Sequence, residues 1–148
     1  MINVSDYRID NYVFFLYEIR RIEGISKRLR PDCGYFEFEG IESKQKGIHV
    51  RPIELTEGMF LKLGYSDEPF GNIKFYKDGD YISIDDNDSK ICFMYRDWAN
   101  NWACYIEYTD SPDSKDDGVK YPIGFDYKYV HEIQNLLYFL IHKDIVFI

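Results

Sequence analysis

The chain has 148 residues, of which 45% are hydrophobic and 18% aromatic, and it carries a net charge of −8. This length suits a single domain, and so much apolar and aromatic surface excludes a chain that is disordered throughout. The negative charge argues against a general binder of free nucleic acid, because such binding depends on cations that replace the counterions of the phosphates.

The charge is unevenly distributed along the chain. Residues 1–51 contain nine Lys and Arg against eight Asp and Glu, whereas residues 52–148 contain nine against eighteen. We therefore expect one domain, 1–148, with a more neutral or basic N-terminal part and an acidic remainder. A basic or uncharged partner suits such a chain better than nucleic acid does.

Most of the chain predicts β-structure. Residues 11–25 are rich in β-branched and aromatic side chains, which favours one long strand or a hairpin. Residues 35–40 alternate apolar and acidic side chains, as a strand with one buried face does. Four further strands are expected at 72–76, 81–84, 91–95 and 102–108. Between the first two of these, Asp78-Gly79 is the strongest hairpin signal.

Two helices are expected. A short one at about 56–63 has Thr56 as its N-cap and Gly64 as its C-cap, and a longer one at about 128–142 has Asp126 as its N-cap. The polar residues 109–120 predict an exposed loop before the second helix. The predicted fold class is therefore α+β, a mainly antiparallel sheet of about six to eight strands with both helices packed on it.

The residue types that serve catalysis and metal binding do not fall into a known pattern. The three cysteines show no C-x-x-C spacing, which gives no disulfide framework and no zinc site. The turn that begins at Asp85 has the alternating oxygen ligands of a calcium loop, but Lys90 and Arg96 stand where an EF-hand needs glycine and glutamate. We therefore predict a solvated hairpin turn there, and a protein that is not an enzyme and holds no metal and no cofactor.

The chain also lacks the features of export and membrane insertion. Its first residues include acids where a signal peptide needs a basic start, and no run approaches the ~20 apolar residues of a membrane span. The sequence thus predicts a cytoplasmic protein with no membrane partner.

Three groups of residues are candidates for binding a partner. The basic group, which suits RNA phosphate or an acidic protein face, is Arg20, Arg21, Lys27, Arg28 and Arg30. The acidic group, whose carboxylates can imitate a phosphate backbone, is Asp110, Asp113, Asp116 and Asp117. The aromatic group is Trp98 and Trp102, which flank a predicted turn and would anchor an interface if exposed. The alternatives are a solvated strand edge, a solvated loop and tryptophans folded onto the core.

Three blocks of the sequence, DYRIDNYVFF, RPIELTEGMFLKLGY and KYVHEIQNLLYFLIHKDI, occur in this order along the chain. They resemble a family of small, mostly uncharacterised proteins of phages and mobile elements. That family has an L-R-I-G-N-like start, a P-I-x-L-T-E helix and a Y-V-H-x-L-Q-N-L-like terminal helix. Asp10 departs from the family pattern, which has glycine there. The resemblance implies helices that pack on a sheet and says little about function.

The leading functional hypothesis is a non-enzymatic interaction protein of a phage or mobile element. By analogy of class, it would inhibit host defence as an anti-CRISPR protein that binds an RNA-guided nuclease or its guide-RNA complex. The alternatives are an accessory or structural phage protein with no defence role, and a small enzyme that uses cysteine or histidine without a known motif.

The acidic group can be tested by charge reversal. If its carboxylates imitate nucleic acid, replacing Asp113, Asp116 and Asp117 by lysine removes inhibition of the nuclease, because the basic channel then repels the loop. A DNA-cleavage assay measures this, and full inhibition by the triple variant would contradict the mimicry.

Overall fold

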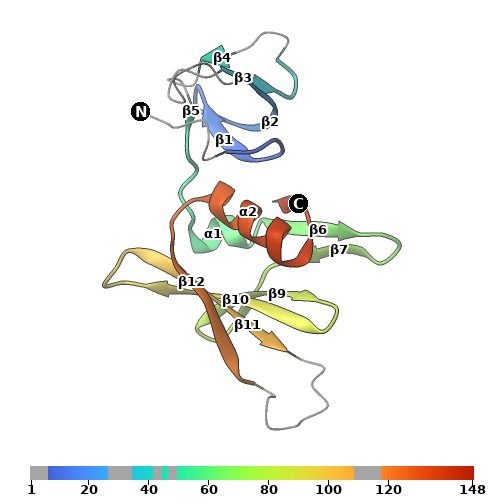
Figure 1. The fold of residues 1–148 in the computed structure, drawn as a ribbon, viewed down its shortest axis with the longest axis vertical. Coiled ribbons are helices and arrows are strands. Elements are labelled where there is room, and N and C mark those ends of the chain that lie inside the picture. The colour runs from blue at the N-terminus through green and yellow to red at the C-terminus, as the bar shows by residue number, and fades with distance from the viewer. Residues whose placement is uncertain (1–6, 27–34, 42–44, 47–49, 109–117) are drawn as a thin grey trace. The chain divides into compact units, whose positions relative to one another are not determined.

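The computed structural model describes residues 7–26, 35–41, 45–46, 50–108 and 118–148, which form thirteen strands and two helices. They fold as two compact units (Figure 1). Unit 1 comprises Met1–Glu54 and Tyr129–Leu136, and unit 2 comprises Leu55–Lys128 and Leu137–Ile148. The sequence predicts one domain, with a change of charge after residue 51, close to the end of the first segment of unit 1.

Unit 1 contains one five-stranded sheet in the order β4-β3-β2-β1-β5. Its strands are β1 (Tyr12–Phe15), β2 (Glu18–Ser26), β3 (Tyr35–Phe38), β4 (Gln45–Lys46) and β5 (Val50–Arg51). All neighbours are antiparallel, and β1 and β2 form a hairpin in which Phe15 lies opposite Glu18. Residues 11–25 are thus a hairpin, which was one of the two arrangements that their composition predicts.

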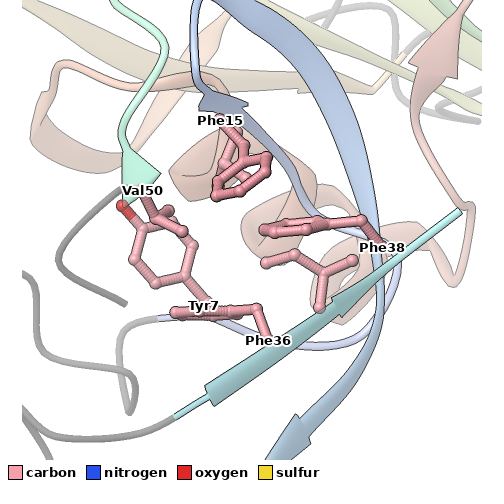
Figure 2. Packing of buried hydrophobic residues seen from close by; sticks show 7 residues of the cluster. Tyr7, Phe15, Phe36, Phe38 and Val50 are labelled. Atoms are coloured by element: carbon pink, nitrogen blue, oxygen red, sulfur yellow. The ribbon is translucent and has the colours of Figure 1, made fainter. Parts of the chain in front are cut away.

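The core of unit 1 is formed mainly by aromatic rings (Figure 2). The Phe15 and Phe38 rings stack with centroids 4.9 Å apart, and Tyr7 meets Phe36 edge to face at 5.8 Å. The fully packed cluster is Tyr7, Val13, Phe15, Ile22, Phe36, Phe38 and Val50. It explains why strands β1 and β3 alternate as they do, since every second side chain enters this cluster.

Side chains from the start of the chain and from helix α2 (Val130–Ile141) form a hydrogen-bonded network in unit 1. Asn135 Oδ1 accepts from Arg8 Nε at 2.7 Å and from Asn11 Nδ2 at 2.9 Å. Gln134 Oε1 accepts from the Tyr12 amide at 2.9 Å. Asn11 and Gln134 are buried, so each needs such partners. The network joins the first and third sequence blocks of the resemblance.

Unit 2 contains the sheet β12-β11-β10-β9-β8 and the smaller sheet β13-β6-β7. The strands of the large sheet are β8 (Tyr76–Asp78), β9 (Tyr81–Asp86), β10 (Ser89–Arg96), β11 (Asn101–Tyr108) and β12 (Lys120–Tyr127). Those of the small sheet are β6 (Leu63–Asp67), β7 (Gly71–Lys74) and β13 (Val146–Phe147), and helix α1 is Glu57–Phe60. Hairpins join β8 to β9 and β9 to β10, as Asp78-Gly79 and the aspartate-rich turn predict. Their two-residue loops are 79–80 and 87–88.

Phe60 of α1 is the centre of the aromatic packing in unit 2. Its ring lies 5.1 Å from Phe75, 5.0 Å from Phe93 and 4.8 Å from Trp102, centroid to centroid. Thr56 caps α1 as predicted, because its Oγ1 accepts from the Met59 amide at 3.2 Å. The core face of the large sheet is therefore the face that carries Phe93 and Trp102.

The α+β class is confirmed, since antiparallel strands dominate and both predicted helices are present. The expected six to eight strands are an underestimate. Gly64 does not cap α1 but lies in β6, and Asp126 does not cap α2 but lies in β12 with φ 88°. Glu132 supplies the cap of α2, where its carboxylate accepts from the Tyr129 amide at 3.0 Å. No helix in the described part of the chain has the length and apolarity needed to cross a membrane.

Gly64 is required by close packing in β6. A Cβ atom there would lie 2.2 Å from the carbonyl oxygen of Ile73, whereas a Cβ at Gly58 would meet nothing nearer than 3.8 Å. We expect Gly64→Ala to lower the free energy of unfolding by about 2 kcal/mol or more, because backbone must move. Gly58→Ala is the matched control and should be neutral or stabilising by up to about 1 kcal/mol, because alanine favours a helix. Urea unfolding measures both, and equal stabilities would contradict the β6 packing.

Candidate functional site

The large sheet of unit 2 has a second face, opposite Phe93 and Trp102, that we call the outward face. Arg96 and Tyr105 lie on it, because successive strand residues alternate between the two faces. Phe125 lies on it as well, because it pairs with Ala103, which is two residues from Tyr105 in β11. Tyr81 joins them from β9. Small buried residues separate these larger side chains, among them Ser83 and Cys92. The outward face therefore carries large aromatic and charged side chains beside small buried ones.

Arg96 connects two exposed aromatic rings. Its guanidinium carbon lies 4.7 Å from the ring centroid of Trp98 and 4.9 Å from that of Phe125. Trp98 is 82% exposed and Phe125 is 51% exposed. Arg96 Nε also donates to Asn101 Oδ1 at 2.8 Å, and Asn101 Nδ2 donates to Asp126 Oδ1 at 3.0 Å. These bonds orient the guanidinium, so the Trp98 ring has a defined place although most of it faces solvent.

The row of rings continues across the sheet. Phe125 meets Tyr105 edge to face at 6.2 Å, and Tyr105 meets Tyr81 in the same way at 6.0 Å. At the far end, Lys120 Nζ lies 4.8 Å from the Tyr81 centroid and forms a 3.3 Å ion pair with Glu107. We call this row the aromatic ladder; its members are Trp98, Arg96, Phe125, Tyr105, Tyr81 and Lys120.

The two tryptophans, which the sequence analysis groups together, have different environments. Trp102 is only 6% exposed, and its indole N–H donates to the carbonyl oxygen of Leu55 at 3.0 Å. It lies on the core face beside Phe60 and is not available to a partner. The reason is the strand register. Trp102 belongs to β11 and lies opposite Tyr95 of β10, whereas Trp98 lies in the turn that precedes β11. Trp102 is therefore corrected to a core residue, and Trp98 is exposed as the hypothesis requires.

The basic group is described only at Arg20 and Arg21; Lys27, Arg28 and Arg30 lie outside the described residues. Arg20 forms an ion pair with Glu18, and Arg21 forms one with Asp10 at 2.8 Å. As adjacent residues of β2 they point to opposite faces of the sheet, so they do not make one patch. The acidic group, Asp110, Asp113, Asp116 and Asp117, also lies outside the described residues.

Two cysteines and one histidine of the described residues are buried. Burial raises the pKa of the Cys92 and Cys104 thiols, which favours the protonated, weakly nucleophilic form at neutral pH. Burial also lowers the pKa of His131 to about 4. Its ring lies 4.3 Å from that of Tyr7 and stacks on Tyr129 at 5.9 Å. Within the described residues, no cluster of three or more His, Cys, Asp or Glu side chains is arranged to hold a metal ion.

Comparisons with family models, with curated proteins and with solved structures found no match to this chain. The resemblance to small phage and mobile-element proteins stays a prediction from the three sequence blocks.

Most of the aromatic ladder was not anticipated from the sequence. Phe125 and Lys120 lie on β12, which is not among the predicted strands, and its Pro122 and Gly124 are residue types that are depleted in strands. Proline is compatible with an edge position, and β12 is at the edge of its sheet. The alternation of Tyr121, Ile123 and Phe125 was the signal that could have indicated this strand.

The His131 environment predicts a pH-dependent stability. The folded state holds the imidazole neutral down to about pH 4, whereas the unfolded chain binds a proton below about pH 6.5. Protonation of the unfolded state should therefore lower the free energy of unfolding as pH falls from 6.5 to 4, by roughly 3 kcal/mol in total. Urea titrations at several pH values should show this loss in the wild type and in the control His142→Asn, but not in His131→Phe. Parallel curves for wild type and His131→Phe would contradict the neutral, buried imidazole.

Proposed function

We propose that this chain is a non-enzymatic interaction protein that binds a partner protein through the aromatic ladder of unit 2, with Trp98 as the anchor. The observation that carries the proposal is a tryptophan that is 82% exposed and yet held against Arg96, which also contacts Phe125. Tryptophan and arginine are the residue types that most often dominate binding energy at protein interfaces. A preoriented ring also loses little conformational entropy when a partner covers it.

The remaining charges on this face favour a partner protein over free nucleic acid. Lys120 is paired with Glu107, and Lys90 is paired with Asp78 at 3.2 Å. Phosphate binding needs cations that are not already neutralised, and the chain as a whole carries −8. An aromatic face on which these two lysines are already paired suits a protein surface that is apolar at its centre and polar at its rim.

In its narrower form, the proposal is that the partner is a host RNA-guided nuclease and that the protein acts in the host cytoplasm as an anti-CRISPR inhibitor of a phage or mobile element. Two features of the sequence support this form. One is the resemblance of the three blocks, and the other is the net charge of −8, which complements the positively charged channel of such a nuclease.

The decisive experiment compares two exposed aromatic residues of unit 2. Trp98→Ala removes the anchor, and Phe70→Ala is the matched control, because Phe70 is also 82% exposed but lies in the turn between β6 and β7. Binding to a purified host nuclease–guide RNA complex, and inhibition of its DNA cleavage, are measured for both variants. We expect Trp98→Ala to weaken binding about 30-fold or more, as the loss of an interface hot spot does, and Phe70→Ala to change it less than about twofold.

Two results would overturn the proposal at different levels. If Trp98→Ala binds and inhibits like the wild type, the ladder is not the interface. If the wild-type protein binds no nuclease complex but forms a Trp98-dependent complex with a phage protein, the inhibitor form is wrong and the accessory role is supported.

A further inference from the structure

The turn of the β1–β2 hairpin in unit 1 has an unusual sequence for its backbone conformation. Leu16 and Tyr17 are the two residues between paired Phe15 and Glu18, and their φ angles are 49° and 72°. A two-residue hairpin loop with both φ angles positive strongly prefers Asn-Gly or Asp-Gly, because other L-residues clash with their own backbone. The chain has Leu-Tyr instead.

The other non-glycine residues with positive φ angles, within the described part of the chain, are of types that tolerate this conformation. The remaining non-glycine cases are Asp10, Asn87, Asn100, Asp126 and His142. Aspartate, asparagine and histidine are the residue types that tolerate this region best. Only Leu16 and Tyr17 break the rule within the described part of the chain, and they do so side by side.

Packing does not compensate for the strain at this turn. Tyr17 is 100% exposed and Leu16 is 60% exposed, so neither gains the burial that could offset an unfavourable backbone. Ile19, just beyond the turn on β2, is 39% exposed as well. Strained conformations that folding does not require are found mainly at functional positions.

We propose that the Leu16–Tyr17 turn is a second docking element, a convex apolar tip that inserts into an apolar pocket of a partner protein. A tip of two adjacent side chains on a tight hairpin is preoriented, and it fits a concave site and not a flat one. The neighbouring Glu18 and Arg20 are paired with each other, so the tip presents no net charge to that pocket. Insertion into a membrane is disfavoured, because anionic leaflets repel a chain of charge −8. The proposal rests on this turn alone and not on the aromatic ladder.

The test begins with identification of what the tip touches. Tyr17 is replaced by the photocrosslinker p-benzoylphenylalanine in the full chain, which is expressed in its source cells and irradiated. The control has the same crosslinker at Phe139, which is 78% exposed on α2. We expect a discrete protein adduct from position 17, with the crosslinked peptide in an apolar pocket of that protein. Adducts only with lipid, only with a second copy, or at neither position would overturn the proposal.

The second step uses the purified partner and the double variant Leu16→Asn, Tyr17→Gly. This variant matches the turn to its backbone and relieves the strain at both positions, so it should raise the melting temperature by about 5 °C or more. It should also weaken binding about 30-fold, because the apolar tip is lost. Asn87→Gly, in the turn of another hairpin, is the control and should leave binding unchanged.

If the double variant is less stable than the wild type, Leu16 and Tyr17 contribute to the stability of the fold. If the double variant binds the partner as the wild type does, the tip does not contact the partner. Either result would contradict the proposal of a second docking element and would leave the proposal for the aromatic ladder unaffected. Conversely, a Trp98→Ala variant that binds normally would remove the ladder and leave this inference standing.

Discussion

The register between β10 and β11 decides which aromatic residues of unit 2 are buried and which are exposed. Phe93 lies opposite Cys104 and Tyr95 opposite Trp102, so these positions enter or border the core, where Phe60 packs. Arg96 and Tyr105 then necessarily lie on the outward face. A slip of one residue would exchange the two sets. The ladder is thus a consequence of the same packing that stabilises the unit, and an alternative register would expose core rings and bury the Arg96 guanidinium.

Local features of the fold could be predicted from the sequence, whereas long-range ones could not. Hairpin turns, the Thr56 cap and the periodicity of α2 depend on neighbours within a few residues. The hydrogen bonds of Asn135 to Arg8 and Asn11 join residues more than 120 positions apart, and no spacing rule indicates them. Gly64 was mistaken for a helix cap because glycine serves equally at a cap and at a close strand contact, which only the approach of Ile73 distinguishes.

The candidate site was anticipated only at Trp98. The sequence places both tryptophans beside a turn, but burial depends on which side of the strand boundary each lies, and that boundary falls between Asn100 and Asn101. In the sequence, Arg96 stands out only because it breaks the calcium-loop pattern, and nothing near it indicates its contacts with Trp98 and Phe125. Arg20 and Arg21, adjacent in sequence, form separate ion pairs. Charge runs and aromatic counts thus indicate that a surface is available for binding, while strand register determines which side chains form it.

The most direct measurement is fluorine NMR of the protein labelled with 5-fluorotryptophan, which gives one resonance for Trp98 and one for Trp102. In the free protein, only the Trp98 resonance should move between H2O and D2O, because Trp102 is buried. On addition of the purified nuclease–guide RNA complex, the account predicts that the Trp98 resonance shifts and loses this solvent effect while that of Trp102 stays in place. A complex that forms and leaves Trp98 as exposed as before would contradict the aromatic ladder as the binding surface.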